Sequence, residues 1–101
     1  MARAQLAPRA RHELLEATRW IGKDSPGAAR RLQHAVIDAA ERLGANPFMG
    51  TRRLELASER YRFLVLTGYP YILVFDCERR PPIIARIVHG ARDLPEVLRD
   101  L

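Results

Sequence analysis

A chain of 101 residues suits one domain with a single modest core, so we treat residues 1–101 as one unit. No apolar run approaches the ~20 residues of a membrane helix, and the first residues lack the apolar core of a signal peptide, which favours a cytoplasmic protein without a membrane partner. The formal net charge of +5, carried almost entirely by arginine, favours an acidic partner.

The first half of the chain predicts a short strand followed by two helices. Residues 3–7 alternate weakly and stop at Pro8, which is typical of a first strand. Residues 9–23 and 26–43 repeat apolar side chains at helical spacing, and Glu13 falls on the face expected to meet solvent. Ser25 is a good N-cap and Gly44 a typical stop signal. The short connection predicts an antiparallel helical hairpin.

The second half predicts a sheet. Residues 60–66, 71–77 and 83–88 read as three strands joined by tight turns, an antiparallel meander whose last strand lies near the middle of the sheet. Leu54–Leu56 is a possible further strand, and residues 93–98 a short helix capped by Asp93. The predicted fold is α+β: an N-terminal strand and an antiparallel helical hairpin packed on an antiparallel sheet, with a three-stranded C-terminal meander and a short C-terminal helix.

Several single residues lead to further expectations. Trp20 lies at the flank of the first apolar stripe, either as a lid over the core or as an exposed anchor for a partner. Arg86, in a strand, must find a partner, and Asp76 across the meander is the expected one. Phe48 and Met49 are expected to fill the edge of the core, and Cys77 to be a buried, inert thiol. No metal-ligand spacing or glycine-rich phosphate loop is present, so neither a metal nor a cofactor is predicted.

Four segments of the chain carry a resemblance to a known family. They are Leu6–Ala10, Asp24–Arg30, Asn46–Gly50 and Val88–Leu94. In this order and spacing the chain resembles the ParE branch of the RelE/ParE superfamily of toxins from type II toxin–antitoxin systems. The resemblance implies a growth-inhibiting toxin held silent by a ParD-like antitoxin. ParE toxins are described as inhibitors of DNA gyrase, whereas RelE-like relatives cut messenger RNA on the ribosome.

The residues can be weighed against both activities. Metal-free cleavage of RNA needs a base, an acid and cations for the phosphate. Arg62, Arg86 and His89 could supply the cations and the acid, and Glu55 the base, although Arg62 could equally line a solvent face. The predicted sheet, however, holds no lysine, and a glycine follows His89 where some nuclease relatives place a tyrosine. We therefore predict a toxin without chemistry of its own that binds gyrase, with a ribosome-dependent mRNA endoribonuclease as the alternative.

Candidate contact residues follow from position and charge. For the target they are Arg86, His89 and Arg92, at and beyond the end of the last strand. An acidic, amphipathic antitoxin segment that folds on binding would suit the basic helical hairpin. Direct binding of nucleic acid is not expected except through partners, because no DNA-reading motif is present. The candidate antitoxin contacts are Leu15, Arg19, Trp20, Arg30 and Arg31.

Overall fold

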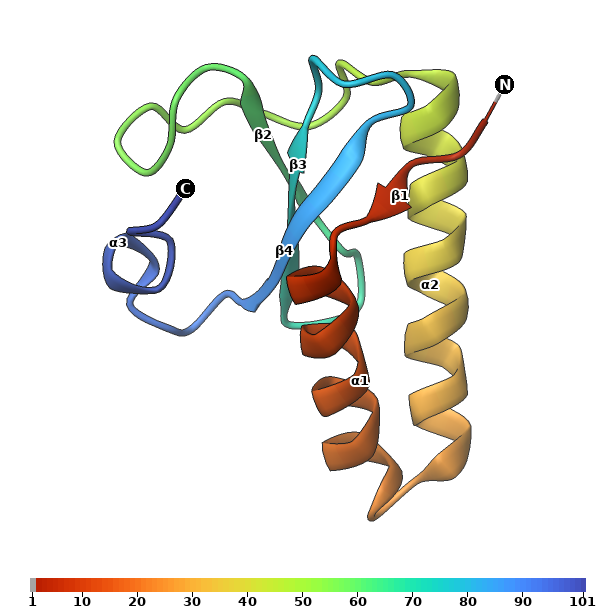
Figure 1. Ribbon diagram of the computed structural model, residues 1–101. Coiled ribbons are helices and arrows are strands. Elements are labelled where there is room, and N and C mark those ends of the chain that lie inside the picture. Colours follow the sequence, from red (N-terminus) through yellow and green to blue (C-terminus); the bar gives the residue numbers. More distant parts are fainter. Residues whose placement is uncertain (1) are drawn as a thin grey trace.

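The computed structural model describes residues 2–101 and confirms the predicted α+β architecture (Figure 1). A four-stranded sheet has the order β1-β4-β3-β2, with the helical hairpin on one face and a short C-terminal helix on the other. No helix within residues 2–101 is both long enough and apolar enough to cross a membrane. The elements are β1 (Gln5–Leu6), α1 (Pro8–Gly22), α2 (Pro26–Ala45), β2 (Tyr61–Val65), β3 (Tyr71–Asp76), β4 (Ile83–His89) and α3 (Leu94–Val97).

The helical hairpin forms as its start and stop signals predict, except that α2 ends later than expected. The Ser25 hydroxyl accepts a hydrogen bond from the Ala28 N–H at 3.1 Å and so caps α2. Gly44 does not end α2, which continues to Ala45. A Cβ added at Gly44 would lie 2.3 Å from the Ala2 carbonyl oxygen, so this glycine lets the chain before β1 pass close to the helix.

The sheet is mixed rather than wholly antiparallel. β1 pairs in parallel with the start of β4, whereas β2, β3 and β4 form the predicted antiparallel meander. The register shifts between Val74 and Phe75, whose partners are Arg86 and Ile84. Ala85 is therefore the extra residue of a β-bulge. Because of the bulge, Ile84 lies on the same face of the sheet as Ile87, packed against the helical hairpin, whereas simple alternation along residues 83–88 would place Ile84 with Arg86.

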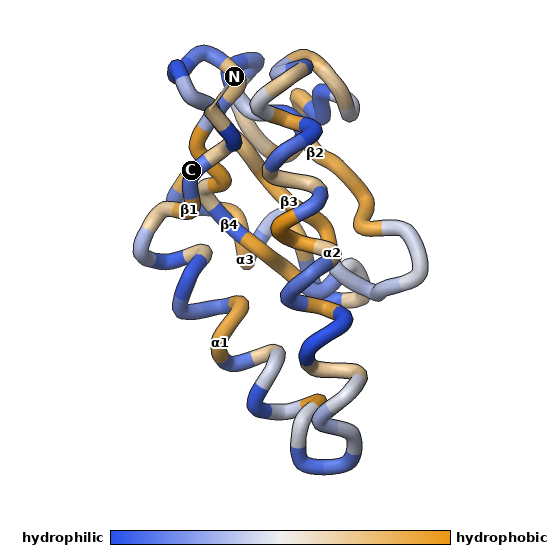
Figure 2. Tube along the Cα trace, turned by 90° about the vertical axis from the view of Figure 1, so that its right-hand side faces the viewer, coloured by the Kyte–Doolittle hydropathy of each residue, from blue (hydrophilic) through white to orange (hydrophobic). Residues whose placement is uncertain are grey.

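Both faces of the sheet are covered. The hairpin packs its apolar stripe against a core that includes Leu73, Phe75 and Ile87. On the opposite face Leu98, beside α3, packs with Phe63 and Val74 in a smaller cluster. Figure 2 shows hydrophobic residues concentrated along the strands, while α1 and α2 alternate between hydrophobic and hydrophilic residues. The C-terminal segment thus covers sheet surface that the hairpin leaves open.

The loops and the last helix depart from expectation in three places. Met49 packs against the core as expected, but Phe48 is 55% exposed, with the Arg80 guanidinium 5.5 Å from its ring centroid. Residues 54–56 form turns rather than a strand, because Thr51 already pairs with the outer edge of β2. Asp93 precedes α3 without a side-chain capping bond. Cys77 is buried as expected.

Candidate functional site

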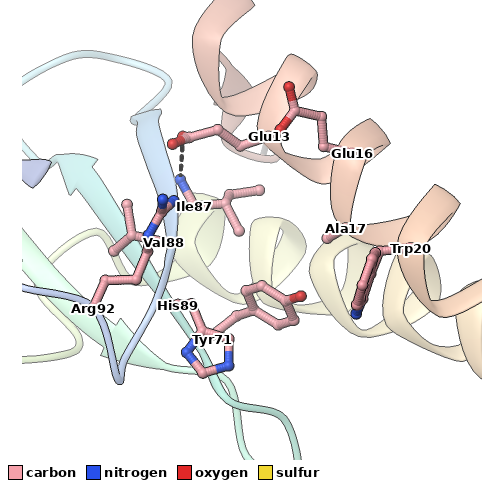
Figure 3. A pocket seen from close by; sticks show the side chains of 9 residues that line it. All are labelled: Glu13, Glu16, Ala17, Trp20, Tyr71, Ile87, Val88, His89 and Arg92. Atoms are coloured by element: carbon pink, nitrogen blue, oxygen red, sulfur yellow. Dashed lines mark hydrogen bonds between the residues drawn. The ribbon is translucent and has the colours of Figure 1, made fainter.

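A cleft of about 500 Å³ opens between α1 and the end of β4 (Figure 3). One wall is formed by α1 and the other by the adjacent ends of β3 and β4, so residues from both halves of the chain meet here. Apolar, aromatic, acidic and basic side chains all contribute. The lining residues are Glu13, Glu16, Ala17, Trp20, Tyr71, Ile87, Val88, His89 and Arg92.

Tyr71 and His89 form the strand wall of the cleft. They are partners in the β3–β4 register, and their rings meet edge to face with centroids 5.5 Å apart. The His89 Nδ1 accepts a hydrogen bond from the Ala91 N–H at 3.1 Å. In the neutral imidazole the proton is therefore on Nε2. The Nδ1 atom of His89 is therefore occupied by the turn after β4, and the Nε2–H is left to donate a hydrogen bond.

Glu13 joins α1 to β4 at the end of the cleft nearest β1. Its carboxylate accepts from the Ile87 N–H at 2.9 Å, drawn as a dashed line in Figure 3, and from the Arg86 guanidinium at 2.9–3.1 Å. The expectation that Glu13 meets solvent was wrong, because β1 is too short to pair with β4 beyond Ile84. The carboxylate takes the place of a strand partner there.

Arg86 is buried, with 4% of its surface exposed, and is held by the protein itself. Besides Glu13, it donates to the Val97 carbonyl at 2.8 Å and to Asp100 at 3.3 Å. The expected pairing with Asp76 was wrong. Asp76 lies 3.1 Å from Arg60 instead, and this carboxylate raises the pKa of the Arg60 guanidinium.

The three nuclease candidates do not come together. Arg62 pairs with Phe75 on the hairpin face, whereas Arg86 pairs with Val74 on the opposite face. The Arg62 guanidinium donates to the carbonyls of Met49 and Gly50, at 3.1 and 3.0 Å, and so anchors the loop before β2. Both guanidinium groups serve the fold, and only His89 lines the cleft.

Glu55, the candidate base, lies outside the cleft. Hydrogen bonds from the backbone and from Arg53 lower the pKa of its exposed carboxyl group. A general base at neutral pH works best with a raised carboxyl pKa, so this environment is opposite to the one required. Within residues 2–101 no group of three histidine, cysteine, aspartate or glutamate side chains could hold a metal ion.

The antitoxin candidates occupy the hairpin surface. Trp20 is 70% exposed and therefore does not form a lid over the core, and the Lys23 ammonium lies 5.0 Å from its ring centroid. The role of Trp20 as an anchor for a partner stays a prediction. Because the hairpin is antiparallel, the last turn of α1 and the first turns of α2 lie at one end of the molecule (Figure 1). The exposed candidates at that end are Arg19, Trp20, Arg30 and Arg31, and the exposed Leu15 lies further back on α1.

The target candidates divide between the cleft and the interior. His89 and Arg92 line the cleft, and Arg86 does not. Sequence reasoning missed Glu13 and Tyr71 as members of this site. The antiparallel order of the meander could have brought Tyr71, at the start of β3, close to His89, at the end of β4, whereas nothing local connects Glu13 with a strand more than seventy residues away.

Comparison with known proteins agrees with this architecture. A family model described as the ParE toxin of type II toxin–antitoxin system, parDE, matches residues 4–94. The chain belongs to the ParE toxin family. Among curated proteins, Toxin RelE3 of Caulobacter vibrioides is 30% identical over 90 residues, which cover 89% of this chain and 96% of that protein. The ParE-family toxin is thus a member of a type II toxin–antitoxin system, which implies an antitoxin partner.

Proposed function

We propose that this ParE-family toxin inhibits growth by binding DNA gyrase, that it acts in the cytoplasm, and that a ParD-like antitoxin neutralises it. The observation that carries the proposal is the placement of Arg62 and Arg86. They lie on opposite sheet faces and donate to protein carbonyls and carboxylates, so the two cannot share one phosphate group. Because Arg62 and Arg86 form no shared phosphate site, binding of a partner protein does not depend on them as a pair.

The cleft supplies a surface with which to bind a partner. His89 and Arg92 lie on the strand side of the cleft and Trp20 lies on its helix side, with the Tyr71 ring between His89 and Trp20 in the view of Figure 3. Aromatic and arginine side chains contribute most to protein–protein binding when they become buried against a partner. We therefore place the target contact at His89 and Arg92, and assign Arg86 the role of holding β4 and the C-terminal segment in position.

A supercoiling assay with purified gyrase tests the proposal. The toxin in excess is expected to abolish supercoiling, and replacing His89 and Arg92 together by alanine is expected to raise the required concentration by about tenfold or more. Arg79→Ala, in the exposed turn between β3 and β4, is the matched control and is expected to inhibit like the wild type. Full supercoiling activity at a large excess of folded wild-type toxin would contradict the proposal.

Ribonuclease activity is the second candidate. Two observations favour it: the curated relative carries the name Toxin RelE3, and His89, Tyr71 and Arg92 share one cleft. An acid, a polar aromatic ring and a cation are groups that RNA cleavage can use. Induced expression separates the two activities. Chromosome breaks with intact transcripts support gyrase as the target, and codon-positioned transcript cuts that disappear in His89→Ala support the nuclease.

A further inference from the structure

In the part of the chain that the structure describes, residues 2–101, the edge of β4 beyond β1 has no strand partner, and it faces the cleft. β1 pairs only with Ile83 and Ile84, while β4 continues to His89. The Gly90 N–H bonds to the Pro70 carbonyl on the β3 side at 2.8 Å, and the Ile87 N–H bonds to Glu13 on the other side. Because backbone groups alternate along a strand, the Ile87 carbonyl and the His89 N–H also point away from β3, toward α1.

These two backbone groups are a ready template for another strand. An unpaired strand edge accepts an extended peptide through main-chain hydrogen bonds, and adjacent pockets select its side chains. Glu13 already satisfies the Ile87 N–H and closes the end of the cleft nearest β1. A peptide strand would therefore pair with β4 beyond the Ile87 N–H and would lie in line with β1 along the same edge of β4.

The side chains around this edge define what the peptide carries. Ala17 and Ile87 give the cleft an apolar part, and Trp20 leaves 70% of its surface uncovered beside it. Arg92 is the cation at the strand end of the cleft, next to His89. Of the two acids, Glu13 is paired with the buried Arg86, and Glu16 is exposed and contacts His12 one turn earlier on α1.

We propose that an extended segment of the antitoxin occupies this cleft as an added strand on β4, with an apolar side chain against Trp20 and Ala17 and an acidic side chain at Arg92. The charge of the chain and the cation at the strand end favour an acidic occupant over a basic one. The inference rests on the antitoxin partner that the family implies. Since the segment would cover His89 and Arg92, it would neutralise the toxin by masking the proposed target contact.

Amide hydrogen exchange in the intact toxin–antitoxin complex tests the added strand. The His89 amide is expected to exchange at least about tenfold more slowly in the complex than in the free toxin. The Gly90 amide, already bonded to Pro70, provides a control in the same strand and is expected to change little. Because both amides are measured without gyrase, the outcome is independent of the proposed target.

Binding of the full-length antitoxin to toxin variants tests the side-chain contacts. Trp20→Ala and Arg92→Glu are each expected to weaken binding at least about tenfold at physiological salt, whereas Arg79→Glu, the same charge change at a remote turn, is expected to stay within about twofold. An unprotected His89 amide, or wild-type affinity for Arg92→Glu, overturns the proposal. Protection of His89 by gyrase but not by antitoxin would overturn the choice of occupant.

Discussion

At the scale of single residues, the arginines show how burial decides between a binding role and a structural one. Arg92 lies at the exposed turn after β4 and is available to a partner, whereas Arg86 donates to Glu13, Asp100 and the Val97 carbonyl. Burying a guanidinium is unfavourable unless carboxylates and carbonyls replace its water. Arg86 meets that condition by joining α1, β4 and the C-terminal segment at one point.

Removing Glu13 therefore has a large predicted effect on stability. Glu13→Ala leaves a buried guanidinium with fewer partners and the Ile87 N–H without an acceptor, and we expect a loss of roughly 3–5 kcal/mol in the free energy of unfolding. Glu13→Gln keeps an acceptor for the amide and is expected to cost less. Urea unfolding measures the free energy of unfolding of the two Glu13 variants.

Glu96→Gln is the control for this prediction. It breaks the exposed pair with Arg99 and is expected to cost at most about 1 kcal/mol. Equal midpoints for Glu13→Ala and the wild type would show that Asp100 and Val97 suffice for Arg86.

How much of this site the sequence could predict also depends on single residues. The segment that ends in His89 and Arg92 stands out because a buried strand stops at polar residues. The partner of Arg86 could not be predicted, because it depends on the bulge at Ala85 and on Glu13, which is distant in the sequence. The alternation of apolar and polar residues in a strand does not reveal that one extra residue forms a bulge.

At the scale of elements, strongly periodic segments were predictable and weakly periodic ones were not. The two long helices and the three meander strands appear within a few residues of their expected limits. Leu54–Leu56 was misjudged because three residues show alternation by chance, and Leu54 is in fact 70% exposed. α3 spans only four residues, so its stability must come from packing rather than from helix propensity.

Leu98 provides that packing. It is 1% exposed and fills the cluster with Phe63, Val74 and Val88 on the second sheet face. We expect Leu98→Ala to lower the free energy of unfolding by about 2–5 kcal/mol, because it removes buried methyl groups and leaves a cavity. Leu54→Ala, the same change at an exposed turn, is expected to stay within about 0.5 kcal/mol. Similar unfolding midpoints for the two variants would mean that the C-terminal segment does not stabilise the sheet.

At the scale of the whole molecule, net charge and size together set how an acidic antitoxin is captured. The toxin carries +5 and measures 38 × 34 × 23 Å. At 0.01 M salt the Debye length is about 30 Å, so every charge on the molecule acts on an approaching partner. At 0.15 M it is about 8 Å, and only charges close to the docking site still act.

The difference between these two Debye lengths predicts how two charge reversals, at opposite ends of β4, affect the rate of antitoxin association. At 0.01 M salt, Arg92→Glu and Arg79→Glu are both expected to slow antitoxin association several-fold, because each removes the same net charge. At 0.15 M salt only Arg92→Glu is expected to do so, since Arg79 lies in the turn at the far end of the strand, roughly 20 Å of β-structure away. Stopped-flow binding at the two salt concentrations measures the effect. If Arg79→Glu remained as slow as Arg92→Glu at 0.15 M salt, the antitoxin would have to make early contact at the β3–β4 turn rather than at the cleft.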